Sequence, residues 1–144
     1  MAIRARHILI VDDYADALDI WALYLRSLGY DVSTAADGAT ALTQAEQLRP
    51  DLIVLDLDLP GISGFEAAKR LRRNPSTQDI PLIAATGYSH QRQLAMAHDA
   101  GFDEVAVKPV DPDSLVEIIE RLLDETVVVR QPNHMVMDSA QENG

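Results

Sequence analysis

The sequence predicts an α/β domain in which a doubly wound, five-stranded parallel sheet carries helices on both faces. Two observations support this prediction. Short apolar segments alternate five times with segments of helical periodicity, and four of the five apolar segments are hydrophobic at consecutive positions. Continuous apolar runs are typical of strands covered on both faces, and the alternating order implies right-handed crossovers between parallel strands.

Each apolar segment corresponds to one expected strand. Four contain only consecutive apolar residues, whereas one alternates between apolar and polar positions and is expected at an edge of the sheet. Five such units favour the flavodoxin-like strand order 2-1-3-4-5, in which ligands lie at the carboxyl ends of the strands. In chain order the expected strands are Ile8–Val11, Asp31–Ala35 (the alternating one), Leu52–Leu55, Leu82–Ala85 and Val105–Val107.

The first expected helix covers residues 14–28 and has an apolar face at helical spacing. Gly29 follows it and would end it, because glycine readily adopts the left-handed conformation at a helix C-terminus. Leu23 points away from the apolar face and is interpreted as an ordinary exposed leucine. The residues assigned to that face are Ala17, Ile20, Trp21, Tyr24, Leu25 and Leu28.

Capping residues predict four further helices. The second helix covers residues 38–48 behind Asp37, and the third opens with the capping box Ser63–Glu66 and stops at Asn74-Pro75, with its arginines on a solvated face. Ser89 is expected to cap a fourth helix that runs to residue 100. Asp111-Pro112 opens a fifth, because proline suits the first helical position, and it is expected to end near residue 124.

Composition limits the function. The 144 residues carry a net charge of -11, which argues against direct binding of nucleic acid, and the absence of cysteine excludes disulfides and thiolate metal sites. No apolar run reaches the roughly 20 residues of a membrane span, so we expect a cytoplasmic protein without membrane insertion. Residues 1–124 are expected to form one domain, and residues 125–144 a partly disordered C-terminal extension.

Polar side chains follow four of the expected strands. Asp12 and Asp13 come after the first, Asp56 after the third, Thr86 after the fourth and Lys108 after the fifth. In the predicted strand order all five would line one site, where converging carboxylates require a cation. Oxygen ligands suit Mg²⁺. A carboxylate nucleophile, a metal, a lysine and a hydroxyl are the parts needed to accept a phosphoryl group.

The pair Asp56 and Asp58 has three interpretations. It can be the nucleophile and acid of a haloacid-dehalogenase-like phosphatase, a single phosphate-accepting aspartate with an acidic neighbour, or a turn before Pro60. Taken separately, the residues after the other strands also suit helix caps and turns. Their joint occurrence at four strand ends favours a site.

The sequence resembles the response-regulator receiver domains of two-component signalling, in the stand-alone, chemotaxis-receiver-like form. The resemblance covers residues 7 to about 124. It implies that Asp56 is the phosphoacceptor and takes its phosphoryl group from a sensor histidine kinase or a histidine phosphotransfer protein. The matching stretches are "ILIVDD", "PDLIVLDLDLPGISGFE", "IPLIAATG" and "VKPVDPDSL".

The resemblance also implies roles for the surrounding residues. Asp13 and Asp56 would bind Mg²⁺ directly, Asp12 would assist through water, and the backbone carbonyl of Asp58 would be a further ligand. Thr86 and Lys108 would contact the phosphoryl oxygens, and the Lys108–Pro109 peptide would be cis.

One position departs from the family pattern. Many receivers carry an aromatic residue on the fifth strand that couples to the threonine, but Val105 stands there in this sequence. Tyr88, two residues after Thr86, is a hypothetical substitute. Asp58 and Tyr88 are expected to modulate the lifetime of the phosphoryl group, because in the family these positions flank the attacking water.

We therefore expect a phosphorylation switch and not an enzyme, apart from Mg²⁺-dependent self-phosphorylation and slow self-dephosphorylation. It would act as a monomer or a phosphorylation-dependent dimer on an unknown downstream protein, through a surface around its fourth and fifth helices. A receiver-like module that binds without phosphorylation, and a receiver cut from a larger hybrid kinase, are alternatives. A phosphatase fits less well, because its acidic pair would follow Asp56, whereas Asp12-Asp13 precedes it, and Pro60 stands where a threonine or valine would.

Overall fold

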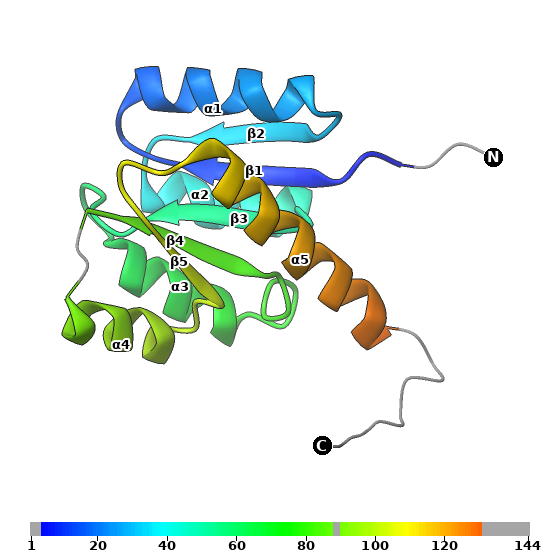
Figure 1. The fold of residues 1–144 in the computed structure, drawn as a ribbon. Coiled ribbons are helices and arrows are strands. Elements are labelled where there is room, and N and C mark those ends of the chain that lie inside the picture. The colour runs from blue at the N-terminus through cyan, green and yellow to red at the C-terminus, as the bar shows by residue number, and fades with distance from the viewer. Residues whose placement is uncertain (1–3, 88–89, 131–144) are drawn as a thin grey trace.

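The computed structural model describes residues 4–87 and 90–130 of the chain. Within these residues five parallel strands form one sheet in the order β2-β1-β3-β4-β5 (Figure 1). The predicted fold class and strand order are confirmed. The strands are β1 (His7–Val11), β2 (Asp31–Ala35), β3 (Leu52–Asp56), β4 (Leu82–Thr86) and β5 (Glu104–Val107).

Helices cover both faces of the sheet and enclose two separate cores (Figure 1). Alternate residues along a strand point to opposite faces, so neighbouring residues Leu9 and Ile10 of β1 belong to different cores. Helices α2 (Gly38–Leu48), α3 (Gly64–Arg73) and α4 (Gln91–Ala100) pack on one face, and α1 (Ala15–Ser27) and α5 (Pro112–Arg130) on the other. β2 lies at an edge and is partly exposed, as its alternating sequence predicts.

The buried face of α1 differs from the predicted one. Trp21, Tyr24 and Leu25 do pack against the core, but Ile20 and Leu28 are 66% and 48% exposed. The innermost side chains are instead those of Leu18, Ala22 and Leu25. The prediction was wrong for Ile20 and Leu28 because α1 has apolar residues around most of its circumference, so spacing alone does not orient it.

Most predicted helix caps are present. Asp37 accepts a hydrogen bond from the Thr40 backbone N–H at 2.7 Å, and Ser63 accepts one from the Glu66 N–H at 3.2 Å. The Glu66 carboxylate pairs with Arg70 at 3.0 Å. Asp111 caps α5 as expected, by accepting from the N–H of residue 114 at 2.9 Å.

Two helix ends differ from expectation. α4 begins at Gln91 with His90 at its N-cap, and the expected cap, Ser89, lies outside the described residues. α5 continues past its expected end at Asp124 to Arg130, since the next helix-breaking residue is Pro132. Among the residues that the structure describes, no helix is long and apolar enough to cross a bilayer.

Arg72 of α3 is not on a solvated face, contrary to expectation. Its guanidinium donates to the carbonyl of Gly101 at 2.9 and 2.7 Å, and to that of Ile80 at 2.6 Å. It also pairs with Asp103 at 2.9 Å. Gly101 has φ +110°, and a Cβ there would lie 2.6 Å from the Arg72 Cγ. Arg72 thus joins α3 to the segments that precede β4 and β5.

Replacing Arg72 should therefore destabilise the fold. In Arg72→Met the carbonyls of Ile80 and Gly101 lose their donors, so we expect the free energy of unfolding to fall by about 2–3 kcal/mol in urea denaturation. The neighbouring exposed Arg73 provides the control, and Arg73→Met should change the free energy of unfolding by less than about 0.5 kcal/mol. Equal losses in the two variants would contradict this role of Arg72.

The cap of α2 should make stability depend on pH. The hydrogen bonds from Thr40 lower the pKa of Asp37 below 3.8 in the folded protein. Charged Asp37 therefore contributes stability that is fully present above 3.8 and is lost as the pH falls through the lower folded value. Asp37→Asn keeps a neutral cap, so the wild type should be more stable at neutral pH and lose that advantage in acid.

Urea unfolding at pH values that step down through 3.8 measures this difference. Asp19→Asn, at an exposed position in the middle of α1, is the control for the loss of one surface charge outside a cap. A gap between wild type and Asp37→Asn that stayed constant into acid would argue against the charged cap.

Candidate functional site

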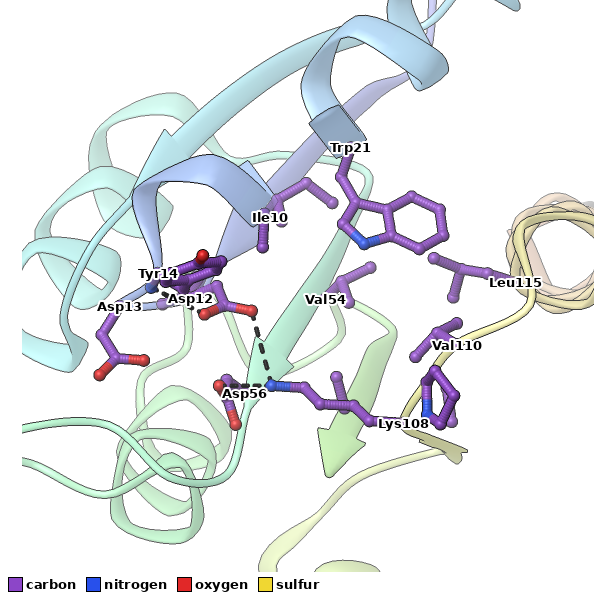
Figure 2. Close-up of a pocket in the computed structure, with 15 residues that line it drawn as sticks. Ile10, Asp12, Asp13, Tyr14, Trp21, Val54, Asp56, Lys108, Val110 and Leu115 are labelled. Carbon is purple, nitrogen blue, oxygen red and sulfur yellow. Dashed lines mark hydrogen bonds and ion pairs between the residues drawn. The ribbon is translucent and has the colours of Figure 1, made fainter. Parts of the chain in front are cut away.

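Four of the predicted polar residues meet at the carboxyl edge of the sheet (Figure 2). Asp12 and Asp13 directly follow β1, Asp56 is the last residue of β3, and Lys108 directly follows β5. β1 and β3 are neighbours, and β4 alone separates β3 from β5. Residues far apart in the sequence are therefore held together by strand order.

Three carboxylates converge in this site. One oxygen atom from each of Asp12, Asp13 and Asp56 lies within 4.8 Å of the other two. Asp56 is only 3% exposed, whereas Asp12 is partly exposed and Asp13 exposed. Carboxylate oxygens with an open, solvent-facing side are the ligands that Mg²⁺ prefers, so this set of residues fits a hard divalent cation.

Lys108 supplies the positive charge of the site. Its Nζ lies 2.9 Å from Oδ2 of Asp56 and 3.6 Å from Oδ2 of Asp12 (Figure 2). Burial alone would lower the pKa of Lys108, but its hydrogen bond with Asp56 and the negative charges of Asp56 and Asp12 outweigh burial and raise it. Lys108 is therefore an ammonium group at neutral pH.

Backbone amides hold the second carboxylate oxygens of Asp56 and Asp12. Oδ1 of Asp56 accepts from the Asp58 N–H at 3.0 Å, and Oδ1 of Asp12 accepts from the Tyr14 N–H at 2.9 Å. Asp56 is thus held from two sides, by Lys108 at one oxygen and by the backbone of Asp58 at the other. The Asp58 residue itself is exposed.

An apolar pocket of about 410 Å³ opens beside the carboxylates, between α1 and the start of α5. Ile10, Val54, Trp21 and Leu115 form its walls, and Asp12, Asp56 and Lys108 lie at its polar end (Figure 2). Trp21 packs against the core, as its spacing predicts, and also lines this pocket. The proximity of Trp21 to the site depends on how α1 lies over β1, which the sequence pattern does not reveal.

Of the three residues expected to relay the signal, the structure describes Thr86 and Val105. Thr86 is fully buried at the end of β4, and its carbonyl accepts from the Lys108 N–H at 2.7 Å. Val105 is partly buried against the core and opposite Ala84 of β4. Tyr88 lies outside the described residues. The Lys108–Pro109 peptide is cis, as the resemblance implied.

Comparison with protein families gives one match. The model of the response regulator receiver domain matches residues 8–120. Among curated proteins, the DNA-binding dual master transcriptional regulator RpaA of Synechocystis is 39% identical over 119 residues, which are 83% of this chain and 49% of RpaA. The chain thus spans about half the length of such relatives.

Solved structures agree in fold. A CheY-like receiver domain protein of Methanospirillum hungatei superposes with a TM-score of 0.81 at 31% identity, covering 86% of this chain and 98% of that one. The receiver domain of the sensor histidine kinase PA1611 of Pseudomonas aeruginosa superposes with a TM-score of 0.78 at 31% identity. The match covers 84% of this chain and 99% of that one. That structure has a magnesium ion coordinated in its active site cleft.

The carboxylate geometry predicts that Mg²⁺ stabilises the protein. An ion that binds only the folded state raises the melting temperature, so millimolar MgCl2 should raise it in thermal scanning. Asp13→Asn removes one of the three carboxylates and should reduce the rise. Asp16→Asn, an exposed acid in the first turn of α1, should leave the rise intact. An undiminished rise in Asp13→Asn would show that Asp13 does not contribute to the ion site.

Proposed function

Because the chain belongs to the response regulator receiver domain family, which is phosphorylated on aspartate, we propose that its phosphoacceptor is Asp56. Receiver domains are in general non-enzymatic signalling modules. The phosphoryl group would come from a sensor histidine kinase or a histidine phosphotransfer protein, as in the family. We assign the receiver domain to residues 1–124 and regard residues 125–144 as an extension, into which α5 continues.

The burial and fixation of the Asp56 carboxylate carry this proposal. Asp56 is the least exposed of the three carboxylates, and both of its oxygens have hydrogen-bond partners in the protein. A nucleophile held in one orientation avoids the entropic cost of finding it during the reaction. Asp12 and Asp13 are more exposed and lie where they can hold a cation.

The chemical step follows from this arrangement. An oxygen of Asp56 attacks the phosphorus of a phosphohistidine, a P–O bond forms, the P–N bond breaks, and the imidazole leaves. Negative charge on the transferred phosphoryl oxygens is stabilised by the Lys108 ammonium and by a hydroxyl donor, for which we propose Thr86. Bound Mg²⁺ would neutralise further charge, with Asp13 and Asp56 as direct ligands, Asp12 through water, and the Asp58 carbonyl as a fourth contact.

Output would pass through a protein surface that changes with phosphorylation. Val105 lacks the aromatic ring of many receivers, so the change at Thr86 would reach the fourth helix by another side chain, for which we propose Tyr88. The Asp58 and Tyr88 side chains would set the lifetime of the phosphoryl group. The downstream partner is proposed to be a protein and not nucleic acid, because the chain carries a net charge of -11. We propose that the protein itself acts in the cytoplasm, as a monomer or a phosphorylation-dependent dimer.

Phosphorylation of Asp56 is directly measurable. With Mg²⁺ and a small acyl phosphate, the wild type should gain one phosphoryl group in intact mass spectra, and hydroxylamine should remove it. Asp56→Asn should gain none, because the amide is not a nucleophile at this position. Asp58→Asn, the matched control two residues away, should still be modified.

Other outcomes distinguish the alternatives. An unchanged adduct in Asp56→Asn would move the phosphoacceptor elsewhere. Failure of the wild type to form an adduct would favour a module that binds without phosphorylation. Rapid multiple turnover of phosphomonoesters would favour the phosphatase.

A further inference from the structure

We propose that Gly38, the first residue of α2, is a positioning residue for Asp56 and acts through the loop between β3 and α3. Gly38 is far from Asp56 in the sequence and does not line the site. The inference rests on the function proposed above and identifies a determinant of the same site.

The loop between β3 and α3 controls one side of the Asp56 carboxylate. Its first exposed residue, Asp58, donates its N–H to Oδ1 of Asp56 at 3.0 Å. The loop is closed at its base, where the Gly64 N–H donates to the carbonyl of Leu57 at 3.0 Å. Any tilt of this closed loop therefore moves the donor that orients Asp56, and with it the carbonyl of Asp58.

The α3 end of the loop has no room to move toward the strand. A Cβ at Gly64 would lie 2.3 Å from the carbonyl oxygen of Asp56 and 2.6 Å from the Cα of Leu57. Backbone on both sides is already in contact there. A displacement at Ile62 is therefore passed along the part of the loop between Asp58 and Ile62.

Gly38 contacts the same loop near its α3 end, at Ile62, from the side of α2. A Cβ on Gly38 would lie 2.9 Å from the carbonyl oxygen of Ile62 and 3.1 Å from its Cβ. The start of α2 is itself fixed, because Asp37 caps it through Thr40. An added methyl group would thus push Ile62 by a few tenths of an ångström, a shift that the closed loop passes on to Asp58.

Gly38→Ala tests this link. We expect the dissociation constant for Mg²⁺ to rise about three- to tenfold, because changes behind a metal site commonly weaken it by this order or more. The rate of phosphorylation by an acyl phosphate should fall by a similar factor. Trp21 lies in the adjoining pocket, so its fluorescence can report Mg²⁺ binding, with calorimetry as a second measurement.

Thermal stability separates positioning from a general effect on the fold. Alanine has a higher helix propensity than glycine, which offsets part of the crowding in Gly38→Ala. The control is Ala39→Gly, which removes a methyl group from the next residue of α2, an exposed one, where Gly38→Ala adds a methyl group. It should lower the melting temperature and leave Mg²⁺ affinity unchanged.

Ile62→Ala changes the other partner of the same contact. Because it removes atoms and causes no crowding, it tests the proposal even if Gly38→Ala does not fold. Truncation loosens the packing of the loop and should also weaken Mg²⁺ binding severalfold. Wild-type affinity in both variants, or an equal loss in Ala39→Gly, would overturn the inference. A wild type that binds no Mg²⁺ and accepts no phosphoryl group would overturn the proposed function as well.

Discussion

The attraction between Asp56 and Lys108 is the interaction on which the site depends. Asp56 is almost fully buried, and a buried carboxylate without a partner is strongly destabilising. Nζ of Lys108 lies 2.9 Å from Oδ2 of Asp56, and this ion pair connects the ends of β3 and β5 across the intervening β4. The charges remain unequal, because three carboxylates share this one ammonium in the described part of the site. The fold thus holds a surplus of negative charge, which suits it to receive cations.

The carboxyl ends and the amino ends of the strands differ in how fully their polar and charged groups are paired. At the carboxyl edge the surplus charge is exposed to solvent on one side. Near the amino ends of β4 and β5, Arg72 donates to three backbone carbonyls, those of Gln78, Ile80 and Gly101, and pairs with a carboxylate. The C-terminal end of α4 is fixed there by Gly101, whereas its N-terminal end follows the strand that carries Thr86. Polar groups near the amino ends of β4 and β5 are thus paired by Arg72, whereas the carboxylates at the carboxyl ends outnumber their ammonium partner.

The sequence contained enough information for the sheet and for most of the site. The strands were recognisable because four contain continuous apolar runs and the fifth mixes apolar and polar positions. The site was recognisable because Asp12, Asp56 and Lys108 lie at the carboxyl ends of strands that the topology brings close together. Periodicity could not orient α1, so Ile20 was placed on the wrong face. Arg72 and Gly38 were missed for a different reason. Their importance comes from how closely two elements approach, and residue spacing within one element contains no such information.

The pocket beside Trp21 also reduces the screening of the Asp56–Lys108 pair by dissolved salt. Dissolved salt screens exposed charges over about 8 Å at physiological ionic strength, but it enters an apolar cavity poorly. The attraction between Asp56 and Lys108 therefore has a low-dielectric wall on one side, formed by Ile10 and Val54 among others. An exposed pair such as Arg70 and Glu66 lacks this protection. Salt should therefore screen the attraction between Asp56 and Lys108 less than it screens exposed ion pairs on the surface, while the carboxylates remain accessible to cations from the solvent side.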